Sequence, residues 1–205
     1  MPKIIQFLLS SLLFQVCLGV QPAAALVGPP SSWPSTFTGF KCLGVQANDL
    51  LADAAGAQND RDIVGDATYA AGGWATDQVY MFIRFRLNGS VLVNGGGAPL
   101  SPFGWGAGID TDGNLANGHE YAVVVNGVNE TVKLFRISDG ATLATWTPTA
   151  VANGYVQAGA TTDGSAFGGD PDFWLTVAIP LADMTGLTKN DANPINMGKF
   201  TVWID

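Results

Sequence analysis

The sequence predicts an all-β protein, an antiparallel β-sandwich of jelly-roll-like form with one or two short helical turns. Three observations predict it. Short apolar runs recur along the chain, Gly-containing turn signals separate them, and no strand–helix alternation of the parallel α/β kind occurs.

The clearest strand is expected over residues 79–87, where residue types alternate with a period of two. One face of this strand carries apolar side chains, at Val79, Met81, Ile83, Phe85 and Leu87. The other face combines two aromatic rings with two arginines, at Tyr80, Phe82, Arg84 and Arg86. Such alternation is typical of a sheet with two distinct faces.

Further strands are expected at short intervals on both sides of this one. They are Gly39–Val45, Phe103–Ile109, Tyr121–Val125, Thr131–Ile137, Leu143–Trp146, Tyr155–Gly159, Phe173–Ile179 and Phe200–Ile204. Asp139-Gly140 lies between two apolar runs and is a strong hairpin signal. Pro180 to Met184 is the best candidate for a helical turn, and an Ala-rich stretch at 49–56 is a second one.

The ends of the chain divide it into a signal, a linker and one domain. Residues 1–25 predict a cleaved secretory signal, because Lys3 precedes an apolar run that ends at Ala23-Ala24-Ala25. Residues 26–38 are rich in Pro, Gly and Ser, which predicts a linker or extended lead-in. The β-sandwich is then expected over 39–205, and its apolar end predicts either a fragment or a central last strand. The expected location is secreted, extracellular or at the cell surface.

Charge and cysteine content restrict the partners. The formal net charge is −8, which disfavours nucleic acid and anionic membrane surfaces as partners. Beyond the signal no apolar run is long enough to span a bilayer, and Cys42 is the one cysteine left, so no internal disulfide is expected.

One short loop offers hard oxygen ligands. Asp110, Asp112, Asn114 and Glu120 lie between two expected strands, and carboxylate and amide oxygens are the ligands that Ca2+ prefers. Leu115 and Tyr121 stand where an EF-hand needs its Gly and its bidentate Glu, so this is not an EF-hand. The loop is either a structural Ca2+ site or an ordinary turn in which these side chains bond their own backbone. Asp60, Asp62 and Asp66, and likewise Asp163, Asp170 and Asp172, are interpreted as solvated turns.

Aromatic and arginine side chains are the case for a ligand surface. Sugar rings stack on flat aromatic faces, while Arg and Asp side chains bond sugar hydroxyls. The candidate ligand-binding residues are Trp74, Tyr80, Phe82, Arg84, Arg86 and Trp105. The alternative is that a second sheet or the lead-in covers this face and that aspartates pair with the two arginines.

Several segments resemble a group of bacterial secreted domains. They are Asp62–Tyr69, Trp74–Asp77, Phe82–Gly89 and Phe103–Gly113, followed by Glu120-Tyr121. The group is similar to family 9 carbohydrate-binding modules and to DOMON-type sandwiches, and the resemblance spans about 60–205. It implies a β-sandwich, with sugar or haem binding in better-known relatives. Haem is disfavoured, because the axial ligands of those relatives are Met and His, and here Met81 falls on the expected core face.

Catalysis has little support in the sequence. A Ser-His-Asp arrangement must use His119, the only histidine, and no nucleophile-elbow pattern occurs. The leading hypothesis is therefore a secreted, non-enzymatic module that binds carbohydrate or another cell-surface polymer. The second is a calcium-stabilised structural or adhesion domain without a small-molecule site, and the third is a secreted hydrolase, for which the many aspartates leave a paired-carboxylate glycosidase open.

Overall fold

The computed structural model describes residues 27–42, 45–46, 58–93, 99–109, 119–146, 154–184 and 200–202. The predicted signal at 1–25 and the Ala-rich stretch at 49–56 lie outside the described residues. Among the described residues, no helix combines the length and the apolar character that a membrane crossing needs.

The described residues form β-strands and one short helical turn. The strands are β1 (Thr38–Gly39), β2 (Lys41–Cys42), β3 (Val45–Gln46), β4 (Gly72–Thr76), β5 (Tyr80–Leu87), β6 (Gly104–Ile109), β7 (Tyr121–Asn126), β8 (Thr131–Arg136), β9 (Ala141–Trp146), β10 (Val156–Ala160), β11 (Phe173–Pro180) and β12 (Phe200–Val202). The helical turn is a 3-10 helix, η3 (Leu181–Asp183), and follows Pro180 as expected.

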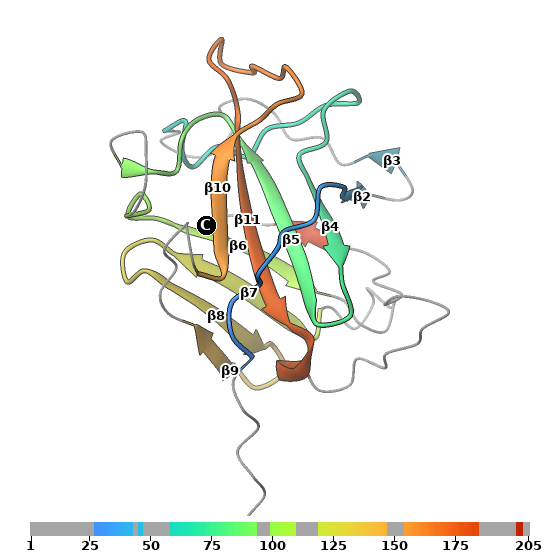
Figure 1. The fold of residues 1–205 in the computed structure, drawn as a ribbon, viewed down its shortest axis with the longest axis vertical. Coiled ribbons are helices and arrows are strands. Elements are labelled where there is room, and N and C mark those ends of the chain that lie inside the picture. The colour runs from blue at the N-terminus through green and yellow to red at the C-terminus, as the bar shows by residue number, and fades with distance from the viewer. Residues whose placement is uncertain are drawn as a thin grey trace, which may run out of the picture.

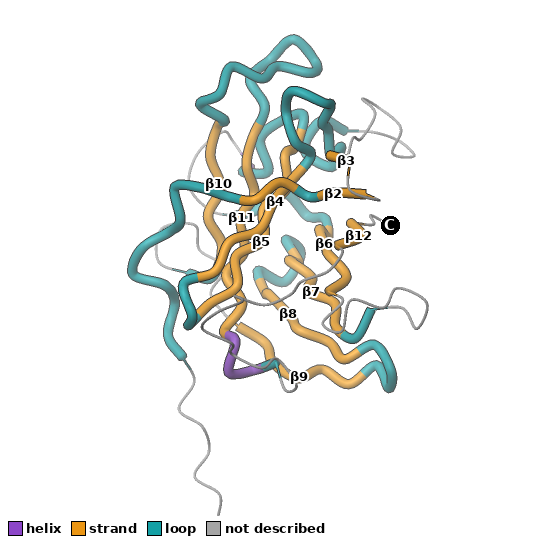
Figure 2. Tube along the Cα trace, turned by 90° about the vertical axis from the view of Figure 1, so that its right-hand side faces the viewer, coloured by secondary structure: helices purple, strands orange, loops and turns teal. Residues whose placement is uncertain are grey.

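Two five-stranded antiparallel sheets face each other (Figures 1 and 2). The first sheet has the order β1-β4-β5-β11-β10 and the second has the order β12-β6-β7-β8-β9. Strands β2 and β3 form a separate pair. The predicted antiparallel β-sandwich with a short helical turn is therefore confirmed.

Strand β5 shows how the alternating sequence builds the sandwich. Met81, Ile83, Phe85 and Leu87 are fully buried and belong to the hydrophobic core. This side of the first sheet, turned toward the second sheet, is its inner face, and the side that carries Tyr80, Phe82, Arg84 and Arg86 is its outer face. Because paired strands keep the pleat in step, Leu175 and Val177 of β11 join the inner face opposite Phe85 and Ile83.

Strand β4 is absent from the predicted strands. Its sequence Gly-Gly-Trp-Ala-Thr begins with two residues that weaken strands in isolation. The structure explains the first glycine by close packing, since a Cβ added at Gly72 would clash with the Arg84 carbonyl oxygen and would lie 2.6 Å from the Phe40 ring. A tertiary contact therefore selects this strand, and local propensity does not reveal it.

The predicted linker is packed against the sandwich where it is described. Residues 27–37, which we call the cover segment, precede β1 and cross in front of β11 and β5 on the outer face of the first sheet (Figure 1). The Trp33 and Phe82 ring centroids are 5.5 Å apart. Tyr80 and Tyr155 donate their hydroxyl hydrogen bonds to the carbonyl oxygens of Gly28 and Val27. These contacts make the cover segment a third layer over part of the sheet.

Candidate ligand-binding pocket

The aromatic–arginine face of β5 is not an open surface. Tyr80, Phe82 and Arg86 are 7%, 0% and 2% exposed. The cover segment and neighbouring side chains account for this burial, because Trp33 packs on Phe82 and Arg86 lies beneath the loop that follows β10. The structure thus matches the alternative in which the lead-in covers this face.

Arg84 and Arg86 form a ladder with aromatic rings on the outer face. The Arg84 guanidinium carbon lies 4.1 Å from the Phe37 centroid and 3.9 Å from the Trp174 centroid. The Arg86 guanidinium carbon lies 4.2 Å from Trp174 and 5.4 Å from Tyr69. Each such cation–π contact contributes about 1 kcal/mol when partly desolvated. The ladder joins the cover segment, β5, β11 and the turn before β4.

The two arginines differ in their charge partners. Arg86 Nη2 lies 2.7 Å from Asp163 Oδ2 and Arg86 Nη1 lies 3.2 Å from Asp163 Oδ1, which is a bidentate pair. This bond to Arg86 holds the pKa of Asp163 well below its usual range. Burial, with the nearby charge of Arg86, lowers the pKa of Arg84 to about 10, so Arg84 stays positively charged at neutral pH.

The two tryptophans predicted to join this face lie elsewhere. Trp74 pairs with Ile83, which places it on the inner face of the first sheet. Trp105 belongs to β6 of the second sheet, is fully buried, and donates its indole hydrogen bond to the Asp60 carbonyl oxygen at 3.0 Å. The six predicted ligand residues therefore do not form one surface. Alternation within one strand assigns side chains to its two faces, but it does not show where other strands lie or what covers each face.

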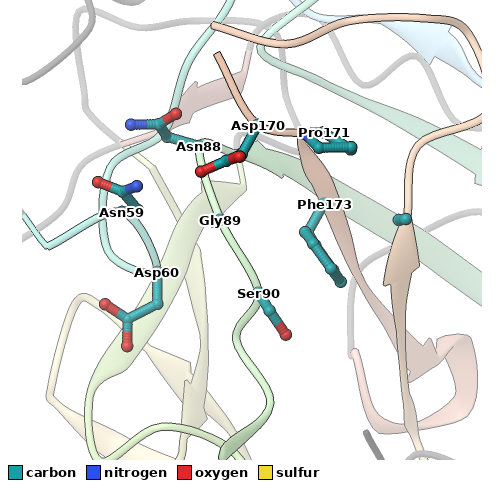
Figure 3. A pocket seen from close by; sticks show the side chains of 9 residues that line it. Asn59, Asp60, Asn88, Gly89, Ser90, Asp170, Pro171 and Phe173 are labelled. Atoms are coloured by element: carbon teal, nitrogen blue, oxygen red, sulfur yellow. The ribbon is translucent and has the colours of Figure 1, made fainter. Parts of the chain in front are cut away.

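A pocket, distinct from the aromatic–arginine face of β5, lies at one end of the sandwich. This end pocket has a volume of about 530 Å3. Its lining residues are Asn59, Asp60, Asn88, Gly89, Ser90, Ala160, Asp170, Pro171 and Phe173. Figure 3 shows Asn59 and Asp60 on one side, Phe173 and Pro171 on the other, and Gly89 with Ser90 between them.

The ends of β5, β10 and β11 position the lining residues. Phe173 pairs with Leu87 on β5 and with Ala160 on β10, so these three side chains share the inner face. Asn88 follows Leu87 directly, is 4% exposed, and its amide nitrogen lies 3.5 Å from Asp62 Oδ2. The Oδ1 atom of Asn88 is buried without a hydrogen-bond partner among the described residues.

The Arg86 network shapes the loop that contributes Asp170 and Pro171. Arg86 donates to Asp163 and to the Ser165 hydroxyl, and its Nη1 lies 3.8 Å from the buried Asp172 Oδ2. Asp172 Oδ1 in turn accepts a hydrogen bond from the Phe167 backbone at 3.0 Å. Through these contacts Arg86 holds the loop between β10 and β11 in its conformation.

The lining defines what the end pocket can bind. Amide groups of Asn59 and Asn88, the Ser90 hydroxyl and the carboxylates of Asp60 and Asp170 are hydrogen-bonding groups, and Phe173 adds a half-buried ring. None of the nine lining residues is Lys or Arg. The nearest described ion pair is weak, with Arg61 Nε 4.0 Å from Asp60 Oδ1. The pocket therefore suits a neutral, hydroxyl-rich ligand better than an anion.

The predicted calcium ligands lie mostly outside the described residues. This holds for Asp110, Asp112 and Asn114, whereas Glu120 is described and half-buried. Ile109 pairs with Tyr121, so the loop joins two neighbouring strands as the sequence predicts. In the described part of the chain no group of three or more His, Cys, Asp or Glu side chains gathers as metal ligands do.

The other acidic clusters serve the local backbone and Arg86. Asp66 Oδ1 accepts hydrogen bonds from the backbone of Thr68 and Tyr69, both at 2.7 Å, as expected for a turn. Asp163 is exposed and accepts a hydrogen bond from the Ser165 backbone, as expected for such a turn, and it also pairs with Arg86. The prediction of solvated turns was wrong for Asp62 and Asp172, which are 1% and 0% exposed. Sequence reasoning missed the end pocket, since Asn59, Ser90 and Phe173 carry no motif and meet only in the folded chain.

Comparison of the chain with protein-family models, with curated proteins and with solved structures finds no match. The resemblance to secreted carbohydrate-binding sandwiches therefore stays a prediction.

Proposed function

We propose that this protein is a secreted, non-enzymatic module that binds carbohydrate or another hydroxyl-rich cell-surface polymer in the end pocket. The observation that carries the proposal is the lining of that pocket. Five side chains able to bond hydroxyl groups line the pocket together with one half-buried aromatic ring, Phe173, and none of the lining residues is basic. Sugars present both hydroxyls and an apolar ring face, and this combination of groups matches both.

Charge also supports a neutral ligand. The chain has a formal net charge of −8, and Asp60 and Asp170 place negative charge at the pocket itself. Nucleic acids, phosphorylated surfaces and acidic glycans are repelled by such a site. Neutral glycans avoid this penalty and use the carboxylates as hydrogen-bond acceptors.

A glycan array on the mature chain tests the proposal. It should carry cello-, xylo-, manno- and chito-oligosaccharides beside acidic glycans, and each spot should be read with and without EDTA. We expect binding to a neutral series, and we expect Asp170→Ala and Phe173→Ala to lower affinity roughly tenfold or more. Asp139→Ala removes the same charge from the turn between β8 and β9 and is the matched control.

The outcomes separate the competing functions. Failure of every glycan to bind, or equal binding by the Asp170→Ala variant and the wild type, contradicts the proposal. Release of shortened oligosaccharides during incubation indicates a hydrolase instead. Loss of glycan binding in the presence of EDTA indicates that a divalent metal ion is needed for binding.

A further inference from the structure

We infer that the ligand is an extended neutral polysaccharide chain that runs from the end pocket over the edge of β10 into a second groove. This inference rests on the proposed function. It adds the statement that the site recognises several sugar units of one chain and not a single terminal unit.

The second hollow lies beside the first. This outer groove has a volume of about 240 Å3. Its lining residues are Gln157, Ala158, Gly159, Ala160, Trp174 and Thr176. Ala160 lines both the outer groove and the end pocket, so one exposed residue separates the two hollows.

The topology leaves a path between them. Strand β10 is the last strand in the order of its sheet, among the described residues. The end pocket uses the inner-face pair Ala160 and Phe173, and the outer groove uses the outer-face pair Gly159 and Trp174. A ligand that passes over the edge at Ala160 therefore reaches both faces without crossing another described strand.

The outer groove has the chemistry of a neutral subsite. Gln157 is exposed and pairs across the strands with Thr176, which is 4% exposed, so the Gln157 amide is the more accessible hydrogen-bonding group. Gly159 has no side chain, and a Cβ placed there has no neighbour within 4 Å. Arg84 and Arg86 lie over the Trp174 ring, so the guanidinium groups occupy its flat surface. Trp174 therefore forms a side wall of the outer groove and is not a stacking platform for a sugar ring.

The length of the groove argues for a chain. Residues 157–160 extend for roughly 10 Å along β10, at about 3.3 Å per residue. That length exceeds one sugar ring, and the end pocket adds further room beyond Ala160. A single monosaccharide fills one hollow, whereas an oligosaccharide fills both.

A length series tests the inference. Isothermal titration should compare mono-, di-, tetra- and hexasaccharides of the cello-, xylo-, manno- and chito- series. We expect affinity to rise about tenfold between the disaccharide and the hexasaccharide, because added units enter the second hollow. Equal affinity for short and long members overturns the inference and leaves the proposed function standing, and absence of all binding overturns both.

Two variants locate the added affinity. Gly159→Phe blocks the outer groove in space that holds no described atom within 4 Å, and an aromatic residue suits a strand. We expect it to remove the gain for the hexasaccharide, and Thr145→Phe on the edge strand β9 is its control. Gln157→Ala, which leaves the backbone unstrained, should remove part of the same gain. If both outer-groove variants keep the wild-type gain in affinity from the disaccharide to the hexasaccharide, the path over Ala160 is contradicted.

Discussion

At the scale of single residues, Arg86 links the outer face of the sheet to the end pocket. It is 2% exposed and bonds Asp163, Ser165 and the Ala70 carbonyl oxygen. An unpaired charge costs several kcal/mol in such surroundings, so these partners are needed for Arg86 to be buried at all. The loop that supplies Asp163 and Ser165 also presents Asp170 and Pro171 to the pocket.

Removing this cation should destabilise the fold. Arg86→Met leaves the buried Asp172 and the partly exposed Asp163 without their cation, and we expect a loss of roughly 3 kcal/mol in the free energy of unfolding. Chemical denaturation measures it. Arg136→Met is the matched control, because Arg136 and Asp139 also lie 2.7 Å apart but have side chains 41% and 48% exposed. A loss in Arg86→Met no larger than in the control contradicts the structural role of Arg86.

Acid should release the same pair. The pKa of Asp163 is held below its usual range in the folded protein. Its carboxylate therefore contributes fully to stability at pH values above the pKa of Asp in the unfolded chain, about 3.9. This contribution is lost progressively as the pH falls below that value. We expect Asp163→Asn to be less stable than the wild type near pH 7, with the difference narrowing toward pH 3. Denaturation midpoints across this range measure it. A difference that stays constant with pH shows that the carboxylate charge is not the cause.

Sequence reasoning reached this scale unevenly. The alternation at 79–87 correctly places Met81, Ile83, Phe85 and Leu87 on one buried face, because the period of a strand is local. The prediction was wrong for Val79, which precedes β5 and is 46% exposed. It could not show that Asp163 pairs with Arg86, since 77 positions separate them in the chain. For the same reason the pocket residues Asn59, Ser90 and Phe173 could not be grouped before the fold was known.

At the scale of elements, the cover segment turns an apparent ligand face into an interior layer. Trp33 and Phe37 lie within a stretch whose Pro and Gly content is typical of a linker. The Pro and Gly content correctly predicts a backbone without long strands or helices, but it does not show that the two aromatic rings pack on Phe82 and Arg84. Strand β4 shows the converse, because its Gly72 is required by close packing against Phe40 and is not a sign of a turn.

The packing of the cover segment can be tested by one truncation. Trp33→Ala removes the ring that covers Phe82, and we expect a loss of about 2 kcal/mol, less than for a fully buried tryptophan because Trp33 is half-buried. Val128→Ala, at a position 66% exposed, should change stability by less than about 0.5 kcal/mol. Urea unfolding of both variants decides the matter. Equal stabilities would show that the cover segment does not contribute to the folded core.

The hairpin loop between β6 and β7 carries the calcium prediction. If Asp110, Asp112, Asn114 and Glu120 bind Ca2+, the ion stabilises the native state by mass action and raises the melting temperature. We expect calorimetry to show this rise on adding Ca2+ and its loss in Asp112→Asn. Asp139→Asn, which changes a carboxylate in another hairpin, should keep the response. A melting temperature that does not change with Ca2+ or EDTA identifies the loop as an ordinary turn.

At the scale of the whole molecule, two packed sheets leave a pocket at one end, which we propose as the binding site. The core seals the space between the sheets, and the cover segment fills part of the outer face. The end pocket and the outer groove meet at Ala160 on the edge strand β10. Fold class could be predicted from periodicity and turns, whereas the location of the site depends on which surfaces the chain itself covers.

Chemical-shift mapping tests the location of the site most directly. Backbone amide signals of the mature protein should be recorded while cello-, xylo-, manno- and chito-hexasaccharides are added in turn. We predict that one neutral series shifts the signals of Asn59, Asn88 to Ser90, Asp170, Asp172 and Phe173, with further shifts at Gln157 to Ala160. Shifts that cluster instead on the cover segment and β5, or the absence of shifts with all four series, would contradict binding at the end pocket.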